Sequence, residues 1–162
     1  MAPKHTLRPI QPGDNQAVAR IIRQVMAEFG AVGDGYSIMD PEVGQMYEAY
    51  HNSRSAFYVI EQQGEVLGCG GIGPLIGGAT DTCELKKMYF LPTLRGKGWG
   101  KRLAIHCLDS ARQLGYRRCY LETVERMTQA NKLYQRLGFQ KLDSALGSTG
   151  HSACETYYAI EL

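Results

Sequence analysis

A stretch rich in glycine and basic residues, LPTLRGKGWGKR at residues 91–102, constrains the fold of this chain more than any other sequence feature. It follows an extended segment that ends in MYFLP and precedes a segment with apolar residues at helical spacing. Glycines before a helix permit positive φ and a close approach of the backbone to a ligand. The first helical turn adds unpaired N–H groups and partial positive charge. The stretch therefore predicts a phosphate-binding site between a strand and a helix.

Two common phosphate motifs do not fit these residues. A Walker loop ends in Gly-Lys-Ser/Thr, whereas Gly100 and Lys101 are followed by Arg102. The dinucleotide fingerprint places its third glycine where Lys101 stands. A glycine-rich loop with a solvated basic face is the alternative that the spacing alone leaves open.

The periodicity along the chain predicts one mixed α/β (α+β) domain over residues 1–162. We expect a single central sheet of about seven strands flanked by about four helices. The strands are expected near residues 5–10, 57–60, 66–72, 82–91, 116–123, 139–142 and 156–162, and the helices near 18–29, 41–52, 98–114 and 127–137.

Composition limits the classes of partner. The net charge of +2 is too small for a general attraction to nucleic acid or to a membrane, and no segment is long enough to span a bilayer. Five cysteines without a CxxC pair, and no signal sequence, predict reduced thiols in a cytoplasmic protein. His151 and Cys154 have no second ligand pair in register, so we expect no metal site.

Two motifs together resemble one enzyme family. The pattern Arg95-x-x-Gly98-x-Gly100 is similar to the coenzyme A signature of the GCN5-related N-acetyltransferases (GNAT), and NKLYQRLGF at residues 131–139 is similar to a second motif of that family. The resemblance covers almost the whole chain. It implies the GNAT fold with a mostly antiparallel sheet, acetyl-CoA as donor, and a primary amine of a small molecule or protein as acceptor. Dimers are common in the family, so a homodimer is also an expectation.

The resemblance implies three groups of coenzyme-binding residues. Main-chain groups of Met88, Tyr89 and Phe90 would hold the pantetheine arm as an added strand. Asn131 would reach the pantetheine region. The Trp99 side chain would pack either under the loop or against the adenine side. Backbone N–H groups of the signature loop would hold the pyrophosphate, namely those of Arg95, Gly96, Lys97, Gly98, Trp99, Gly100 and Lys101.

The reaction needs a base, because an alkylamine is mostly protonated at pH 7 and only the neutral amine attacks a thioester. Glu84 is the first candidate, since it lies on the strand that leads into the signature loop. Strict alternation along that strand would place Glu84 and Met88 on one face and Tyr89 on the other. Glu122 is the second candidate base and Asp81 a weaker third.

The departing thiolate needs a proton, and Tyr134 is the candidate acid. A phenol with a pKa of about 10 can donate to a thiolate whose acid has a pKa of about 8.5. We expect direct transfer in a ternary complex, because cysteines such as Cys83 and Cys154 are more often small buried apolar residues than nucleophiles. A coenzyme A-binding sensor without catalysis is the alternative function.

The acceptor side is weakly indicated by the sequence. In the resembling family the acceptor pocket is built from the first two helices and the loop between the last two strands. The candidates that these segments offer are Tyr36, Glu42, Tyr47 and His151.

Overall fold

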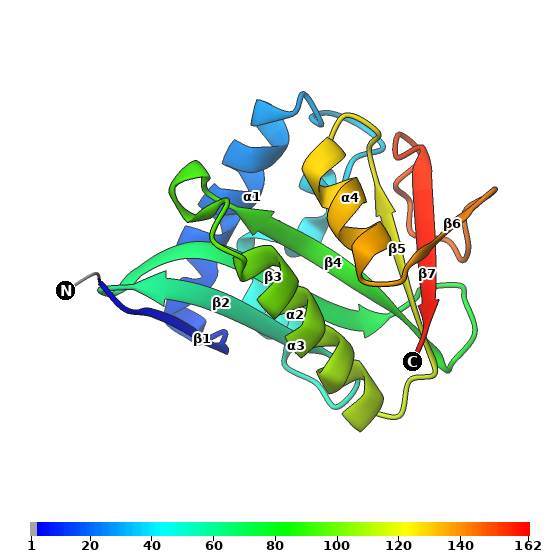
Figure 1. The fold of residues 1–162 in the computed structure, drawn as a ribbon, viewed down its shortest axis with the longest axis horizontal. Helices are drawn as coiled ribbons and strands as arrows, with labels where there is room; N and C mark the ends of the chain where they lie inside the picture. Colours follow the sequence, from blue (N-terminus) through cyan, green and yellow to red (C-terminus); the bar gives the residue numbers. More distant parts are fainter. Residues whose placement is uncertain (1–2) are drawn as a thin grey trace.

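The computed structural model describes residues 3–162, and its centre is a seven-stranded sheet in the order β1–β2–β3–β4–β5–β7–β6 (Figure 1). Only the β4–β5 pair is parallel among the strand pairs of the described chain. The predicted mixed, mostly antiparallel sheet with four helices is therefore confirmed. The strands are β1 (His5–Pro9), β2 (Ala56–Gln62), β3 (Glu65–Pro74), β4 (Thr82–Phe90), β5 (Arg118–Thr123), β6 (Gln140–Leu142) and β7 (Thr156–Glu161), and the helices are α1 (Asn15–Glu28), α2 (Met46–Tyr50), α3 (Trp99–Gln113) and α4 (Thr128–Arg136).

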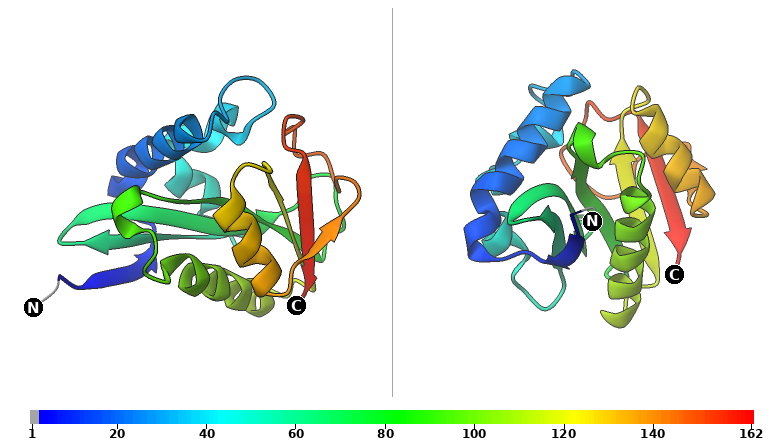
Figure 2. Two further views of the ribbon diagram at one scale, coloured as in Figure 1. Left: turned by 45° about the horizontal axis from the view of Figure 1, so that its top comes forward. Right: turned by 60° about the vertical axis from the view of Figure 1, so that its left-hand side comes forward.

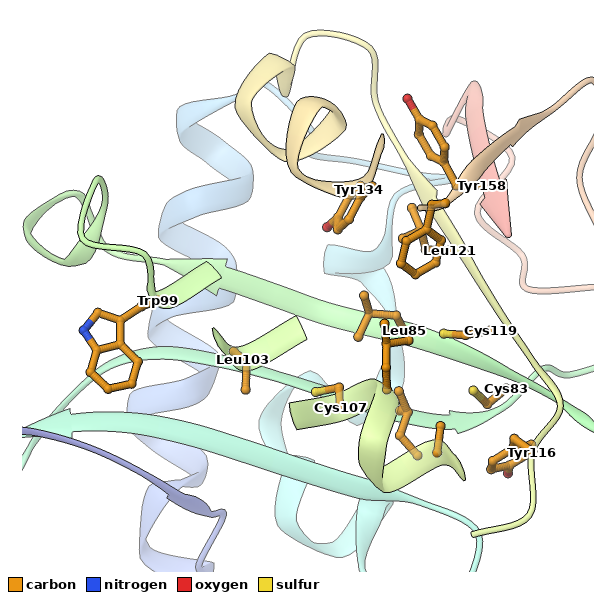
Figure 3. Packing of buried hydrophobic residues seen from close by; sticks show 14 of the residues in the cluster. Cys83, Leu85, Trp99, Leu103, Cys107, Tyr116, Cys119, Leu121, Tyr134 and Tyr158 are labelled. Atoms are coloured by element: carbon orange, nitrogen blue, oxygen red, sulfur yellow. The ribbon is translucent and has the colours of Figure 1, made fainter. Parts of the chain in front are cut away.

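The helices cover the sheet on both faces (Figures 1 and 2). The apolar stripe of α1, with Val18 and Ile22 fully buried, packs with α2 against one face of β2 and β3. The stripe of α3, with Leu103 and Cys107, packs against the other face, where Tyr134 of α4 joins the same cluster (Figure 3). The sheet is thus enclosed between two apolar layers, as its two-sided burial requires.

The second helix is shorter than the helix predicted over residues 41–52. The chain forms a 3₁₀ turn at Pro41–Gly44 and begins α2 only at Met46. Gln45 between them has φ −145° and ψ 50°, which no α-helix can continue. The break leaves Asp40 and Glu42 on an irregular segment beside β4, where both carboxylates contact Lys87.

β4 and β5 separate part-way along their length. Their pairing covers only Thr82–Cys83–Glu84 against Arg118–Cys119–Tyr120, and the rest of β4 has no strand partner on that edge among residues 3–162. A bulge in β4 then shifts its register with β3 at the level of residues 86–89, and Lys87 adopts a left-handed φ of 55°.

The bulge corrects one detail of the sequence prediction. The extra residue reverses the alternation, so Tyr89 packs in the α1 layer while Met88 packs in the α3 layer. Tyr89, and not Met88, therefore lies on the face that carries Glu84, because Glu84 and Tyr89 are paired with Gly73 and Cys69, which share a face of β3.

Truncation of the buried stripe of α3 tests this packing. Leu103 is 0% exposed and Ile105, on the same helix, is 40% exposed. We expect Leu103→Ala to lower the free energy of unfolding by about 2–5 kcal/mol, since it leaves a cavity in the core. Ile105→Ala should cost about 1 kcal/mol or less in the same urea titration. Equal losses for the two variants would contradict the assigned orientation of α3.

Candidate active site

A cleft opens where β4 and β5 separate. Its walls come from β4, the end of β5, α4, the loop after α1 and the loop before β7. The lining residues are Met26, Ala31, Tyr36, Ser37, Glu84, Leu85, Lys86, Lys87, Met88, Tyr89, Leu121, Glu122, Thr123, Val124, Met127, Ala130, Tyr134, His151 and Cys154. The cleft thus brings together Glu84, Glu122, Tyr134 and His151, which the sequence predicted for the site.

The signature loop presents unpaired backbone donors. Gly96 and Gly98 have φ of 76° and 82°, a region that glycine enters without strain. The N–H of Arg95 donates to the Pro92 carbonyl, and that of Arg102 donates to the Gly98 carbonyl. Between them, the N–H groups of residues 96–101 donate to no acceptor within residues 3–162. This stretch is therefore available to bind an anion at the start of α3.

The side chains of this loop anchor it to the rest of the fold. Arg95 forms an ion pair with Glu28, and its Nε donates to the Phe90 carbonyl over 3.0 Å. Trp99 is buried, and the Arg102 guanidinium lies 3.9 Å from its ring centroid. The Trp99 ring packs in the α3-side core, with its centroid 5.7 Å from that of His5.

Two residues of the second motif lie on the α4 side of the cleft. Tyr134 is 7% exposed, and its ring extends from α4 toward β4 (Figure 3). Burial raises the pKa of this phenol, so the hydroxyl keeps its proton at neutral pH. The amide nitrogen of Asn131 donates to the carbonyls of Val124 and Met127 over 3.1 and 2.9 Å. Its buried Oδ1 has no partner in the described part of the chain.

The two candidate bases differ in their surroundings. Glu84 is 4% exposed, and burial raises its pKa to about 7 although Lys86 lies 3.9 Å away. Burial acts in the same sense on Glu122, but hydrogen bonds from His151, Thr149 and Tyr120 outweigh it and hold the pKa of Glu122 below its usual range. Glu84 can therefore exchange a proton near neutral pH, whereas Glu122 stays ionised.

His151 joins two carboxylates across the cleft. Its Nε2 lies 2.8 Å from Asp40 Oδ2 and its Nδ1 lies 3.2 Å from Glu122 Oε1. Ionised carboxylates only accept, so both ring nitrogens donate and the ring is an imidazolium. These bonds raise the pKa of His151 to about 9, against the effect of burial. Glu84, Glu122 and His151 each offer an atom within 4.8 Å of the others, but an imidazolium has no lone pair for a metal.

The remaining predicted residues divide into those at the cleft and those away from it. Tyr36 lines the cleft, and Glu42 Oε1 lies 3.4 Å from Lys86 Nζ. Tyr47, on α2, does not line this cleft and stacks on His51 in a separate groove. Asp81 is exposed, directly before β4, and does not line the cleft.

The cysteines are poorly suited to nucleophilic attack. Cys83 lies in the α3-side core. Cys154 lines the cleft, but burial and then the neighbouring carboxylates raise its pKa to about 12. A thiol with this pKa is almost fully protonated at pH 7.

Sequence reasoning missed Asp40, Lys86 and Lys87 as parts of the site. A signal for the lysines was present, because ELKKMYF places two consecutive cations in an apolar strand just before the signature loop. Asp40 carried no such signal, since its partner His151 lies 111 positions away in the sequence.

The family model of the acetyltransferase (GNAT) family matches residues 22–139. The chain belongs to this family. Family membership confirms the resemblance seen in the two motifs and the expectation of an acetyltransferase enzyme. Among residues 3–162, no helix has the length and apolar character needed to cross a membrane.

Relatives and solved structures agree with this assignment. An uncharacterised N-acetyltransferase of Escherichia coli, YjgM, is 48% identical over 96% of this chain and 94% of its own length. A Staphylococcus aureus acetyltransferase of the GNAT family has a TM-score of 0.84 at 17% identity, covering 98% of this chain and 99% of that one. YncA from Salmonella typhimurium, solved with its cofactor acetyl-CoA, has a TM-score of 0.78 at 21% identity, over 98% and 94% of the two chains.

The imidazolium state of His151 is testable by pH titration. A histidine whose folded pKa is raised stabilises the fold below its unfolded pKa of 6.5, and this contribution is lost as pH rises through about 9. We expect the stability advantage of the protein over His151→Gln to fall by roughly 2–3 kcal/mol between pH 6 and pH 10. One histidine NMR signal should titrate near pH 9 and be absent from the variant. Titration of all histidines near pH 6.5 would contradict the two hydrogen bonds.

Proposed function

We propose that this protein is an acetyl-CoA-dependent N-acetyltransferase that moves the acetyl group directly to a primary amine. The observation that carries the proposal is the run of unpaired N–H groups at residues 96–101, at the end of the strand that also carries Glu84. A buried base on β4 and an anion site in the loop that follows this strand suit a substrate with a diphosphate at one end and a thioester at the other. The name of the Escherichia coli relative, an N-acetyltransferase, supports the same function.

The coenzyme would lie between α3 and α4. Its diphosphate would accept from the N–H groups of residues 96–101, and its pantetheine arm would pair with the free edge of β4 at Met88, Tyr89 and Phe90. The orphaned Oδ1 of Asn131 fits an amide N–H donor such as those of the pantetheine arm. A strand N–H at Met88 or Tyr89 would donate to the thioester oxygen as it gains charge.

The residues of the cleft supply the proton transfers. Glu84 accepts a proton from the ammonium group, and the neutral amine attacks the thioester carbon. The N–C bond forms and the C–S bond breaks, while Tyr134 donates its proton to the departing thiolate. The second proton lost by the nitrogen restores the phenol, and Glu84 releases its proton to solvent. No bond to the protein forms, in keeping with the raised pKa of Cys154.

The pair formed by Glu84 and Tyr134 favours catalysis over a sensor role. A module that only binds coenzyme A needs neither a carboxylate with a pKa near 7 nor a phenol in the cleft. Cytoplasmic localisation and a homodimer stay predictions from the sequence.

Substitution of Gly98 tests the coenzyme site. A side chain at Gly98 would enter open space beside the free N–H groups. Gly98→Glu should abolish acetyl-CoA binding in calorimetry, because its carboxylate would occupy the anion site and repel a diphosphate. Gly98→Ala carries the same backbone strain, of about 1 kcal/mol, without the charge and should keep measurable binding. Unchanged affinity in Gly98→Glu would refute the site.

Removal of either proton-transfer group should lower turnover in different ways. We expect Tyr134→Phe to reduce kcat by roughly 10²–10⁴-fold with little change in coenzyme affinity. For the unmodified protein, the raised pKa of Glu84, about 7, predicts that kcat/KM rises with pH around that value. Glu84→Gln should lower turnover and remove this rise. Thiol release from acetyl-CoA with an amine library is the measurement. Wild-type turnover in either variant would exclude that residue from its role.

A further inference from the structure

Seven charged side chains form one chain of alternating sign on the acceptor side of the cleft. The successive N···O distances are 3.9, 3.4, 3.8, 2.6, 2.8 and 3.2 Å. In order, the members of this ion chain are Glu84, Lys86, Glu42, Lys87, Asp40, His151 and Glu122.

The ion chain lacks one cation. Each of its three cations lies between two carboxylates, and Asp40 and Glu42 each lie between two cations. The end members, Glu84 and Glu122, have one cationic neighbour each among residues 3–162. Their oxygens lie within 4.8 Å of each other, and both residues line the cleft. Two carboxylates therefore face one another, and a positive charge between them would complete the alternating order of charges.

The space between these carboxylates suits an ammonium group. An N⁺–H···O⁻ bond spans about 2.7–2.9 Å, and the N–H bonds of an ammonium group diverge at the tetrahedral angle, so one nitrogen bridges two oxygens about 4.4–4.7 Å apart. The observed separation of no more than 4.8 Å is compatible with that spacing. A metal ion at the same place would lack its third ligand, because both nitrogens of His151 donate to carboxylates.

We propose that the ammonium group of the acceptor binds between Glu84 and Glu122 as the eighth member of the ion chain, and that the acceptor is a cationic amine without a carboxylate on its amine-bearing carbon. The proposal rests on the proposed function and names its substrate class. From this position one ammonium proton passes to Glu84, which later releases it to solvent, and the neutral amine remains beside the thioester.

The same charges disfavour free α-amino acids. Their carboxylate would enter the cleft together with the amine, close to Glu84 and Glu122. Lys86, Lys87 and His151 already have two carboxylates each, so no cation of the ion chain is free to receive another. Like charges brought together without a counterion cost binding free energy, which lowers the affinity for such a ligand.

Matched substrate pairs test the proposal on the unmodified protein. Tyramine and tyrosine differ only in the carboxylate, as do histamine and histidine, and tyrosinamide restores the carbon skeleton without the charge. With acetyl-CoA at a fixed saturating concentration, we expect kcat/KM for tyramine and tyrosinamide to exceed that for tyrosine by about 100-fold. Equal or better turnover of the amino acids would overturn the proposal.

A variant locates the effect in the ion chain. Glu122→Gln keeps the shape of the side chain and removes one charge facing the ammonium group. We expect its KM for tyramine to rise by about 10-fold or more, with unchanged affinity for acetyl-CoA and a smaller preference for tyramine over tyrosine. Glu65→Gln, an exposed substitution on β3, is the matched control and should leave all three values unchanged. An unaltered preference in a folded Glu122→Gln variant would count against the proposal.

Calorimetry separates failure of this proposal from failure of the proposed function. If acetyl-CoA binds but no amine releases thiol, the proposed function fails. The ammonium site is then tested by binding measurements alone. Tyramine and tyrosine are titrated separately into the coenzyme-bound protein, and their affinities are compared. Tighter binding of tyramine supports the site, and equal or tighter binding of tyrosine overturns it. Loss of tyramine binding on treatment with a chelator would place a metal ion in the gap and would also overturn it.

Discussion

The early end of the hydrogen bonding between β4 and β5 is the constraint on which the rest of the structure depends. Main-chain groups of a buried strand need partners, and beyond Glu84 the inner edge of β4 has none from β5. The separated strands form a cleft that can receive another extended segment. On one side of this cleft α4 contributes Tyr134, and on the other the ion chain connects the segment ahead of α2 with β4 and with the loop before β7.

The ion chain joins β4 and β5 to the segment ahead of α2 and to the loop before β7. Lys87 pairs with Asp40 ahead of α2, and His151 connects Asp40 with Glu122 at the end of β5. Removing one member would leave a buried charge without its partner. The free energy of unfolding would then fall by more than the intact ion pair contributes to it. Lys87 combines its buried ion pair to Asp40 with a left-handed φ of 55° at the bulge of β4.

In the signature loop the side chains fix the position of the loop, and the backbone offers free hydrogen-bond donors. Arg95 and Trp99, which look from the sequence like ligands of an anion or a nucleotide, fix the loop against Glu28 and the α3-side core. The glycines leave the N–H groups unobstructed. β4, which carries Glu84, ends at Phe90, and only the 3₁₀ turn at Pro92–Leu94 separates it from this loop.

The sequence by itself determined the elements, the single mixed sheet, the family and the residues of the two motifs, because helical periodicity, glycine placement and short spacings are local properties. It failed at the bulge, where one extra residue moved Tyr89 onto the face of Glu84, and it could not choose between Glu84 and Glu122. Only the tertiary structure shows how the surroundings of these two carboxylates differ. The ionisation of a buried carboxylate depends on partners such as His151 and Lys86, which come from different parts of the chain. A local sequence pattern does not show which distant charged residues will be in contact.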